Sequence, residues 1–292
     1  MSQPVKAILA ALAIWGCLAP AQAQLYAVDD EKHTIKEYNA DTGAPIKASL
    51  VSGLVDPCAI TFSGGYLFIT DFFYGRVGKY DATTGATIND SLVTGVPQAQ
   101  AVAVSGNDLY VCSLVGDGTG LVGKYDATTG AAINDSLVTK LVGPVGVGVS
   151  GNKLFVVYGN GLGSVGEFDT NSGAAIEQKF VKYLPDPACL FLSGHYLWIL
   201  ITMGGNGGGI DKFNLDAGPS VGATHRPYVM DLKIPNALTV SGDNLFVTDR
   251  TNKTIGKYKA STGEVINASF ISGLKCSYDG ITAVPGAPTG PP

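Results

Sequence analysis

One short hydrophobic pattern recurs six times along the chain. Each copy begins with Leu, continues with an aromatic residue and then two mostly apolar residues, which is typical of a buried β-strand. The copies begin at Leu25, Leu67, Leu109, Leu154, Leu197 and Leu245. The steps between them are 42, 42, 45, 43 and 48 residues, a period that indicates a repeat architecture.

A second strand follows each copy and ends in an aromatic residue, and a glycine falls five positions later. The aromatic residues are Tyr38, Tyr80, Tyr125, Phe168, Phe213 and Tyr258, and the glycines are Gly43, Gly85, Gly130, Gly173, Gly218 and Gly263. In the copy Asp81-Ala82-Thr83-Thr84-Gly85 the carboxylate can accept a backbone hydrogen bond, and the glycine can take a positive φ. We interpret this segment as a hairpin turn, because a phosphate or metal loop would not need six copies.

A further strand precedes five of the six leucines and ends in a Ser-Gly turn, so one unit has four strands. In the second unit these are Ile60–Phe62, Leu67–Thr70, Val77–Tyr80 and Ala86–Val93, named A to D. Four antiparallel strands joined by tight turns make one propeller blade, and blades bury their faces by packing around an axis. The predicted fold is all-β, a six-bladed β-propeller.

The two ends of the chain complete one blade. After residue 23 there are six B–C–D sets but only five A strands before them, and the sixth A-like segment is Tyr278–Ala283. We therefore predict that this C-terminal strand pairs with the strand that begins at Leu25 and closes the ring, so that no sheet edge at this joint stays unpaired.

These motifs resemble the repeats of the NHL and YVTN propeller families, within the six-bladed superfold of the gluconolactonase/senescence-marker type. The matching segments are Gly280-Ile281-Thr282-Ala283, Pro235-Asn236-Ala237-Leu238-Thr239-Val240, Leu245-Phe246-Val247-Thr248-Asp249 and Val77-Gly78-Lys79-Tyr80-Asp81. The resemblance covers residues 24–284 and implies the fold. It says almost nothing about chemistry, because the matching residues are strand and turn positions.

The N-terminal 23 residues have the features of a secretory signal peptide. Lys6 precedes the apolar run Ala7–Ala19, and Ala21-Gln22-Ala23 supplies a small-x-small cleavage site. We expect cleavage after Ala23 and a secreted or periplasmic protein; the alternative is lipoprotein cleavage before Cys17, although Trp15 is bulky for that site. The domain organisation is then a signal peptide (1–23), one propeller (24–284) and a disordered Pro/Gly tail (285–292), with no transmembrane segment.

Composition and charge exclude some partners. The net charge is −5 and no run of Lys or Arg occurs, so we expect no nucleic acid binding. Four cysteines follow the leader, without CxxC spacing, and scattered thiols of this kind are typical of buried small side chains, although export permits disulfides. They are Cys58, Cys112, Cys189 and Cys276. We expect a monomer.

Variation between the repeats concentrates on one face of the predicted ring. The A–B and C–D turns are nearly uniform, whereas the B–C and D–A loops differ, and function is usually carried by variable loops on a rigid scaffold. The B–C loop of the second unit contains Phe72, Phe73, Tyr74 and Arg76. Three successive aromatic residues cannot all point inward, so these four residues are candidates for contact with a protein, peptide or glycan, the alternative being packing over the neighbouring blade.

The mouth of the central channel is the second candidate region. Asp56, Gln98, Gln100, Asn236 and Asp279 stand at or before the starts of A strands, where carboxylates and amides could hold a hard cation such as Ca²⁺, with Asn236 and Asp279 as the possible ligands. Asp29, Asp71 and Asp249 follow B strands at one repeat position, where anchoring of the loop is the favoured interpretation. Metal-dependent lactonases on this superfold use a Glu, an Asn and an Asp at the mouth, but no Glu begins any A strand here.

The sequence identifies no catalytic residues and requires no cofactor. It favours a non-enzymatic binding or scaffold propeller over two alternatives. One is a metal-dependent hydrolase or lyase that uses the channel mouth, and the other is a structural protein of the cell surface.

Overall fold

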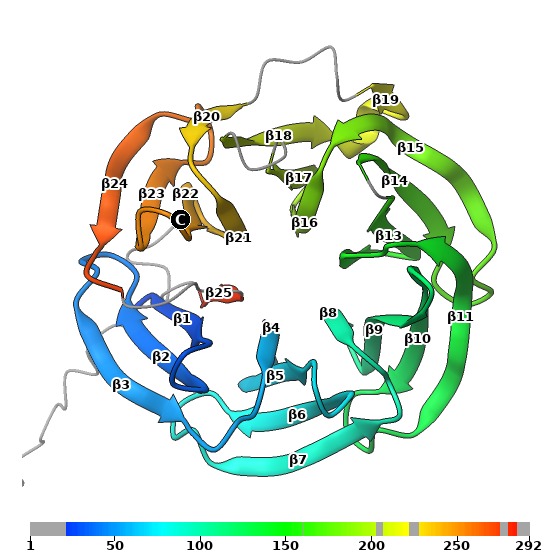
Figure 1. Cartoon of the computed structure of the whole chain (residues 1–292), viewed down its shortest axis with the longest axis horizontal. Coiled ribbons are helices and arrows are strands. Elements are labelled where there is room, and N and C mark those ends of the chain that lie inside the picture. The colour runs from blue at the N-terminus through cyan, green and yellow to red at the C-terminus, as the bar shows by residue number, and fades with distance from the viewer. Residues whose placement is uncertain (1–21, 160, 203–206, 222–227, 275–279, 285–292) are drawn as a thin grey trace, which may run out of the picture.

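The protein forms a closed ring of six β-sheets (Figure 1). The computed structural model describes residues 22–159, 161–202, 207–221, 228–274 and 280–284. Each blade has four antiparallel strands, and the innermost strands surround the axis. This confirms the predicted six-bladed β-propeller.

The strands run outward from the axis in the order A to D. Blade 1 contains β25 (Ile281–Val284), β1 (Gln24–Asp29), β2 (Thr34–Asn39) and β3 (Pro45–Val51). Blade 2 contains β4 (Pro57–Ser63), β5 (Tyr66–Asp71), β6 (Arg76–Asp81) and β7 (Thr87–Thr94). Blade 3 contains β8 (Ala99–Ser105), β9 (Asp108–Gly116), β10 (Thr119–Asp126) and β11 (Ala132–Val142).

The other three blades follow the same order, with two irregularities. Blade 4 contains β12 (Gly146–Ser150), β13 (Lys153–Tyr158), β14 (Leu162–Asp169), β15 (Ala175–Pro185) and an added fifth strand, β19 (Ser220–Val221). Blade 5 contains β16 (Pro187–Ser193), β17 (Tyr196–Ile201), β18 (Gly208–Asn214) and the short β20 (Val229–Leu232). Blade 6 contains β21 (Pro235–Ser241), β22 (Asn244–Asp249), β23 (Thr254–Lys259) and β24 (Val265–Ile271).

The ring closes as predicted, by pairing of the last strand with the first. β25 runs antiparallel to β1, with Tyr26 opposite Thr282 and Ala27 opposite Ile281. The Val28 amide extends this ladder by donating to the Gly280 carbonyl at 2.9 Å. The joint therefore satisfies backbone groups that an open edge would leave unpaired.

Apolar packing between blades forms the core. One buried cluster lies at each of the six blade boundaries. At the first boundary Tyr26 and Val28 of β1 lie in one cluster with Leu67 and Ile69 of β5. Burial of each such side chain contributes about 1.5–3 kcal/mol, so these contacts are the main source of stability.

Lysines of strand C, three of them buried and Lys212 half-buried, add a second contact between blades. Lys79, Lys124, Lys212 and Lys257 occupy one repeat position on strand C, and each Nζ donates to a backbone carbonyl in the C–D turn of the next blade, at 2.9–3.3 Å. The ammonium group of Lys212 also lies 4.2 Å from the ring centre of Tyr196 and 4.5 Å from that of Trp198. Burial lowers the pKa of Lys212 and Lys257.

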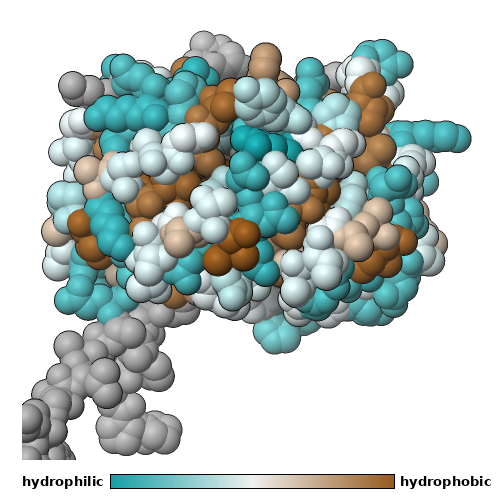
Figure 2. Space-filling view, turned by 90° about the horizontal axis from the view of Figure 1, so that it is seen from below, coloured by the Kyte–Doolittle hydropathy of each residue, from teal (hydrophilic) through white to brown (hydrophobic). Residues whose placement is uncertain are grey.

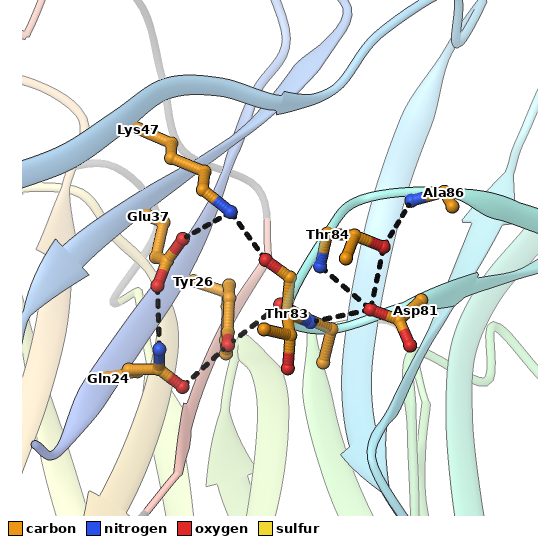
Figure 3. A network of polar contacts seen from close by, with 9 residues as sticks. Gln24, Tyr26, Glu37, Lys47, Asp81, Thr83, Thr84 and Ala86 are labelled. Carbon is orange, nitrogen blue, oxygen red and sulfur yellow. Dashed lines mark hydrogen bonds and ion pairs between the residues drawn. The ribbon is translucent and has the colours of Figure 1, made fainter. Parts of the chain in front are cut away.

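Blade 1 replaces this lysine with Glu37 and makes the contact through other residues (Figure 3). The Tyr26 hydroxyl lies 3.0 Å from the Ala82 carbonyl oxygen of blade 2, and Lys47 donates to the neighbouring Thr83 carbonyl. The Gln24 amide donates to Glu37 Oε1 at 2.7 Å. Burial raises the pKa of Glu37 despite the opposing effect of Lys47.

The rim of the ring carries apolar side chains scattered among polar ones (Figure 2). Five exposed isoleucines occupy one position at the start of strand D: Ile46, Ile88, Ile133, Ile176 and Ile266. Single exposed apolar residues are normal on protein surfaces, so the rim as a whole is not evidence of a binding site. Among the residues that the structure describes, no helix is long and apolar enough to span a membrane.

Candidate binding face

Blades 3 and 4 have longer outer strands than blades 1, 2 and 6. The outer strands β11 and β15 each have 11 residues, whereas β3, β7 and β24 have 7 or 8. The additional residues lie at the D–A end. In blades 3 and 4 the strands on either side of the B–C loop leave only a short connection: β9 ends at Gly116 and β10 begins at Thr119, and β13 ends at Tyr158 and β14 begins at Leu162.

Exposed apolar side chains gather on these three adjacent blades. Tyr74 is 57% exposed and Phe73 is 73% exposed in the B–C loop of blade 2. Blades 3 and 4 add four residues at the ends of their lengthened strands, each about half exposed or more: Val115, Val142, Leu162 and Tyr183. Exposed apolar residues at the same end of neighbouring blades make this end a candidate interaction surface.

The loop of blade 2 holds its aromatic residues in a fixed arrangement. Phe72 is half-buried, and the rings of Phe73 and Tyr74 meet edge to face with centres 5.5 Å apart. The Arg76 guanidinium lies 5.0 Å from the centre of the Tyr74 ring. Both Nε and Nη2 of Arg76 donate to Asp71 Oδ2 at 3.3 Å, which fixes the guanidinium.

The aspartates that end the B strands anchor these loops. Asp71 Oδ1 accepts from the Tyr74 amide, Asp249 Oδ1 from the Asn252 amide and Asp29 Oδ1 from the Lys32 amide, each at 3.0 Å. All three carboxylates are buried. The same bond thus recurs three residues along each loop, as the anchoring interpretation requires.

The predicted mouth residues lie at the D–A end of the innermost strands. Asp56 and Gln98 directly precede β4 and β8, and their carbonyls accept from the amides of Phe72 and Leu114 at 2.9 and 3.4 Å. Gln100 lies in β8 and Asn236 lies in β21, both half-buried. Asp279 lies outside the described residues.

The structure adds Asp186 to this set, at the same repeat position in blade 5. Its carbonyl accepts from the Thr202 amide at 3.0 Å, as that of Asp56 does from Phe72. Sequence reasoning missed Asp186 although it precedes Pro187 as Asp56 precedes Pro57, a signal that a full alignment of the six repeats provides.

The channel itself is lined mainly by apolar side chains. A cavity of about 280 Å³ is bounded by all six innermost strands, with Phe62, Val104, Val149 and Phe191 among its walls. Calcium prefers carboxylate, amide and carbonyl oxygens, so a calcium site would have to lie at the mouth rather than in the channel. In the described ranges no three His, Cys, Asp or Glu residues come together as a metal-binding group.

Three cysteines lie in the described part of the chain. Cys112 is buried, and Cys58 and Cys189 are half-buried. Burial raises the pKa of the Cys189 thiol to about 12, which disfavours the reactive thiolate. Cys276 lies outside the described residues.

Comparison with solved structures shows the fold. A chain of the nidogen/laminin complex superposes with a TM-score of 0.69 at 16% identity, covering 90% of this chain and 98% of that one. TolB from Acinetobacter baumannii gives 0.67 at 11% identity, covering 90% and 67%. A chain of the hydrazine synthase of Kuenenia stuttgartiensis gives 0.58 at 16% identity, covering 81% and 73%.

Neither a protein-family model nor a curated protein matches this chain. At these low identities the superpositions establish the propeller architecture and nothing finer.

Proposed function

We propose that the chain is an exported, non-enzymatic binding propeller of the NHL/YVTN type that holds a protein partner on its B–C/D–A face. The observation that carries this proposal is the exposed pair Phe73 and Tyr74, fixed by Arg76 and Asp71. Aromatic and arginine side chains dominate the energetics of protein interfaces. A pair that is rigid before binding loses little conformational freedom on association.

The apolar residues of blades 3 and 4 extend the proposed contact surface. Val115, Val142, Leu162 and Tyr183 add exposed apolar area at the same end of the next two blades. Such area suits the apolar centre of a protein interface better than a glycan, which needs many polar partners for its hydroxyl groups. One of the similar propellers was solved in a nidogen/laminin complex, which supports use of this architecture in protein binding.

The test compares two variants of blade 2 that each remove an exposed apolar side chain. Phe73→Ala removes the ring from the proposed face, and Ile88→Ala removes a side chain from the rim, where it is 53% exposed. The purified protein is cross-linked to exported proteins of its source and also applied to a glycan array. We expect a protein partner that binds wild type and Ile88→Ala equally and binds Phe73→Ala about 30-fold more weakly, as for a hot-spot residue.

Circular dichroism melting curves must show that both variants remain folded. Equal binding by both variants, or a specific glycan ligand with no protein partner, would contradict the proposal.

A further inference from the structure

The outer edge of blade 4 accepts an additional strand from the chain itself. β19 pairs in parallel with β15, with Val181 opposite Ser220 and Lys182 opposite Val221. β19 follows the C–D turn of blade 5, so the chain turns back to reach its preceding neighbour (Figure 1). Strand addition at this edge is therefore a contact that the fold already makes once.

β11 of blade 3 has the same construction as β15. On their inner sides the two strands pair in one register, since Val122 lies opposite Val138 as Val165 lies opposite Val181. Both strands have 11 residues. Both also contain a residue with positive φ at the same place, Lys140 at 61° and Tyr183 at 59°.

The difference between the two strands is the outer partner. In the described part of the chain, β11 is the last strand of its sheet, whereas β15 is followed by β19. Proteins usually keep edge strands short, because an edge offers unpaired amide and carbonyl groups to other chains. The outer edge of β11 is longer than the 7 or 8 residues of β3, β7 and β24, and register shifts in its pairing with β10 divide it into short segments, one of which contains Val138.

Side chains near this edge provide further contacts. Ile133, near the start of β11, is 55% exposed, and Val142, at its end, is 49% exposed. In strand addition the main chain supplies affinity, and side-chain contacts supply specificity.

We propose that the outer edge of β11 is a docking site for an extended segment of a partner protein, which adds as a parallel strand at Val138 and Thr139. The register follows from blade 4, so a small residue pairs with Val138 and a β-branched residue pairs with Thr139. This site lies on the outer rim of blade 3 and does not depend on the aromatic pair of blade 2.

The chain contains a matched control for this proposal. The heptapeptide Ile-Asn-Asp-Ser-Leu-Val-Thr occurs at 88–94 in β7 and again at 133–139 in β11. β7 ends at Thr94, while β11 continues to Val142. Thr94 and Thr139 are both exposed and end the same heptapeptide. The difference between them is that the strand continues only after Thr139.

The experiment is disulfide trapping with a synthetic peptide that carries residues 216–221 with cysteine in place of Val221. Thr139→Cys and Thr94→Cys proteins are incubated with it in a glutathione buffer, with wild type as the background for native thiols. Cross-strand partners lie within the range of Cα separations that a disulfide spans. We expect Thr139→Cys to trap the peptide at least about ten-fold faster than Thr94→Cys, at equal thiol reactivity towards a small aromatic disulfide.

Register provides the second measurement. Moving the cysteine of the peptide to the position of Ser220 should slow trapping by Thr139→Cys, because in a paired strand that residue lies opposite Val138. Equal rates for the two protein variants, or for the two peptides, would overturn the proposal.

Discussion

The C–D turn of blade 3 offers a sharp test of how closely the blades pack. Gly130 has a φ of 76°, and a Cβ built on it would lie 1.7 Å from the carbonyl oxygen of Leu92 in blade 2. Equivalent glycines lie at the boundaries on either side. A Cβ built on Gly85 or Gly173 would lie 1.8 Å from a leucine carbonyl oxygen of the preceding blade. The turn glycine is thus required for its conformation and for its lack of a side chain.

Gly106 separates these two requirements. It lies in the A–B turn of the same blade, with a φ of 59°, and apart from its chain neighbours no atom lies within 4 Å of a Cβ built there. Gly106→Ala should therefore lower the free energy of unfolding only by the cost of placing an alanine at positive φ, about 1–2 kcal/mol. Gly130→Ala should lower it by this amount and a further 1–3 kcal/mol or so, because the turn must move away from Leu92 and loosen the boundary.

Urea unfolding measures the difference. Trp15 lies in the predicted leader, so Trp198 is the single tryptophan of the remaining chain, and it is buried. Its fluorescence should report a lower transition midpoint for Gly130→Ala than for Gly106→Ala, with a gap in unfolding free energy of at least about 1 kcal/mol. Equal losses would refute the claim that the close approach to Leu92 matters.

Three further predictions concern the contacts between blades. Lys257→Met should lower the free energy of unfolding by about 1–3 kcal/mol in a melting assay, because the hydrogen bond from Nζ to the Ala40 carbonyl between blades 6 and 1 is lost. Lys259→Met, at a half-buried position, should change the free energy of unfolding little. Glu37→Gln should raise stability at pH 7. Burial raises the pKa of Glu37 above 4.5, so stabilisation by its protonated form is complete below that pH and lost as pH rises through the folded pKa. The gain over wild type should then vanish in melts below about pH 4, and a gain that persists there would contradict this cause. Deletion of residues 277–292 should open the inner edge of β1 and cause aggregation or a large fall in melting temperature, so unchanged melting would contradict the role of the β25–β1 pairing.

The architecture was predictable because the signals that specify it are repeated. Leucine-aromatic strands, glycine turns after strand C and Ser-Gly turns each recur at spacings of 42 to 48 residues, so the assignment of one copy is supported by the other copies. The closing strand was predictable for a related reason, since counting strands left one A strand missing at the start and one extra at the end. The pairing of β25 with β1 confirms that count.

The candidate face was less predictable, because its shape depends on features that do not repeat. The aromatic loop at 72–74 could be found from composition, but the exposure of Leu162 and Tyr183 depends on strands that extend past the usual end of the blade. The contacts that the strand C lysines make between blades were hard to predict for another reason. A charged residue in mid-strand suggests a solvated position, and only its recurrence at Lys79, Lys124, Lys212 and Lys257 indicates a contact between blades.

The duplicated heptapeptide shows how identical residues can belong to outer strands of different length. At 88–94 and 133–139 the identical residues make the same local hydrogen bond, in which the Asn side chain accepts from the amide two residues on, at 3.0 and 3.1 Å. The following residues then differ. Gly95, with a φ of 75°, ends β7, whereas Lys140, Leu141 and Val142 continue β11 towards the loop face. Residues inside the repeat fix the packing of neighbouring blades, so they cannot vary without loss of stability. Just beyond it, Lys140 and Val142 are exposed, whereas Leu141 is buried in the cluster between blades 3 and 4, so the longer strand keeps one anchor in the core while it extends the edge of the blade.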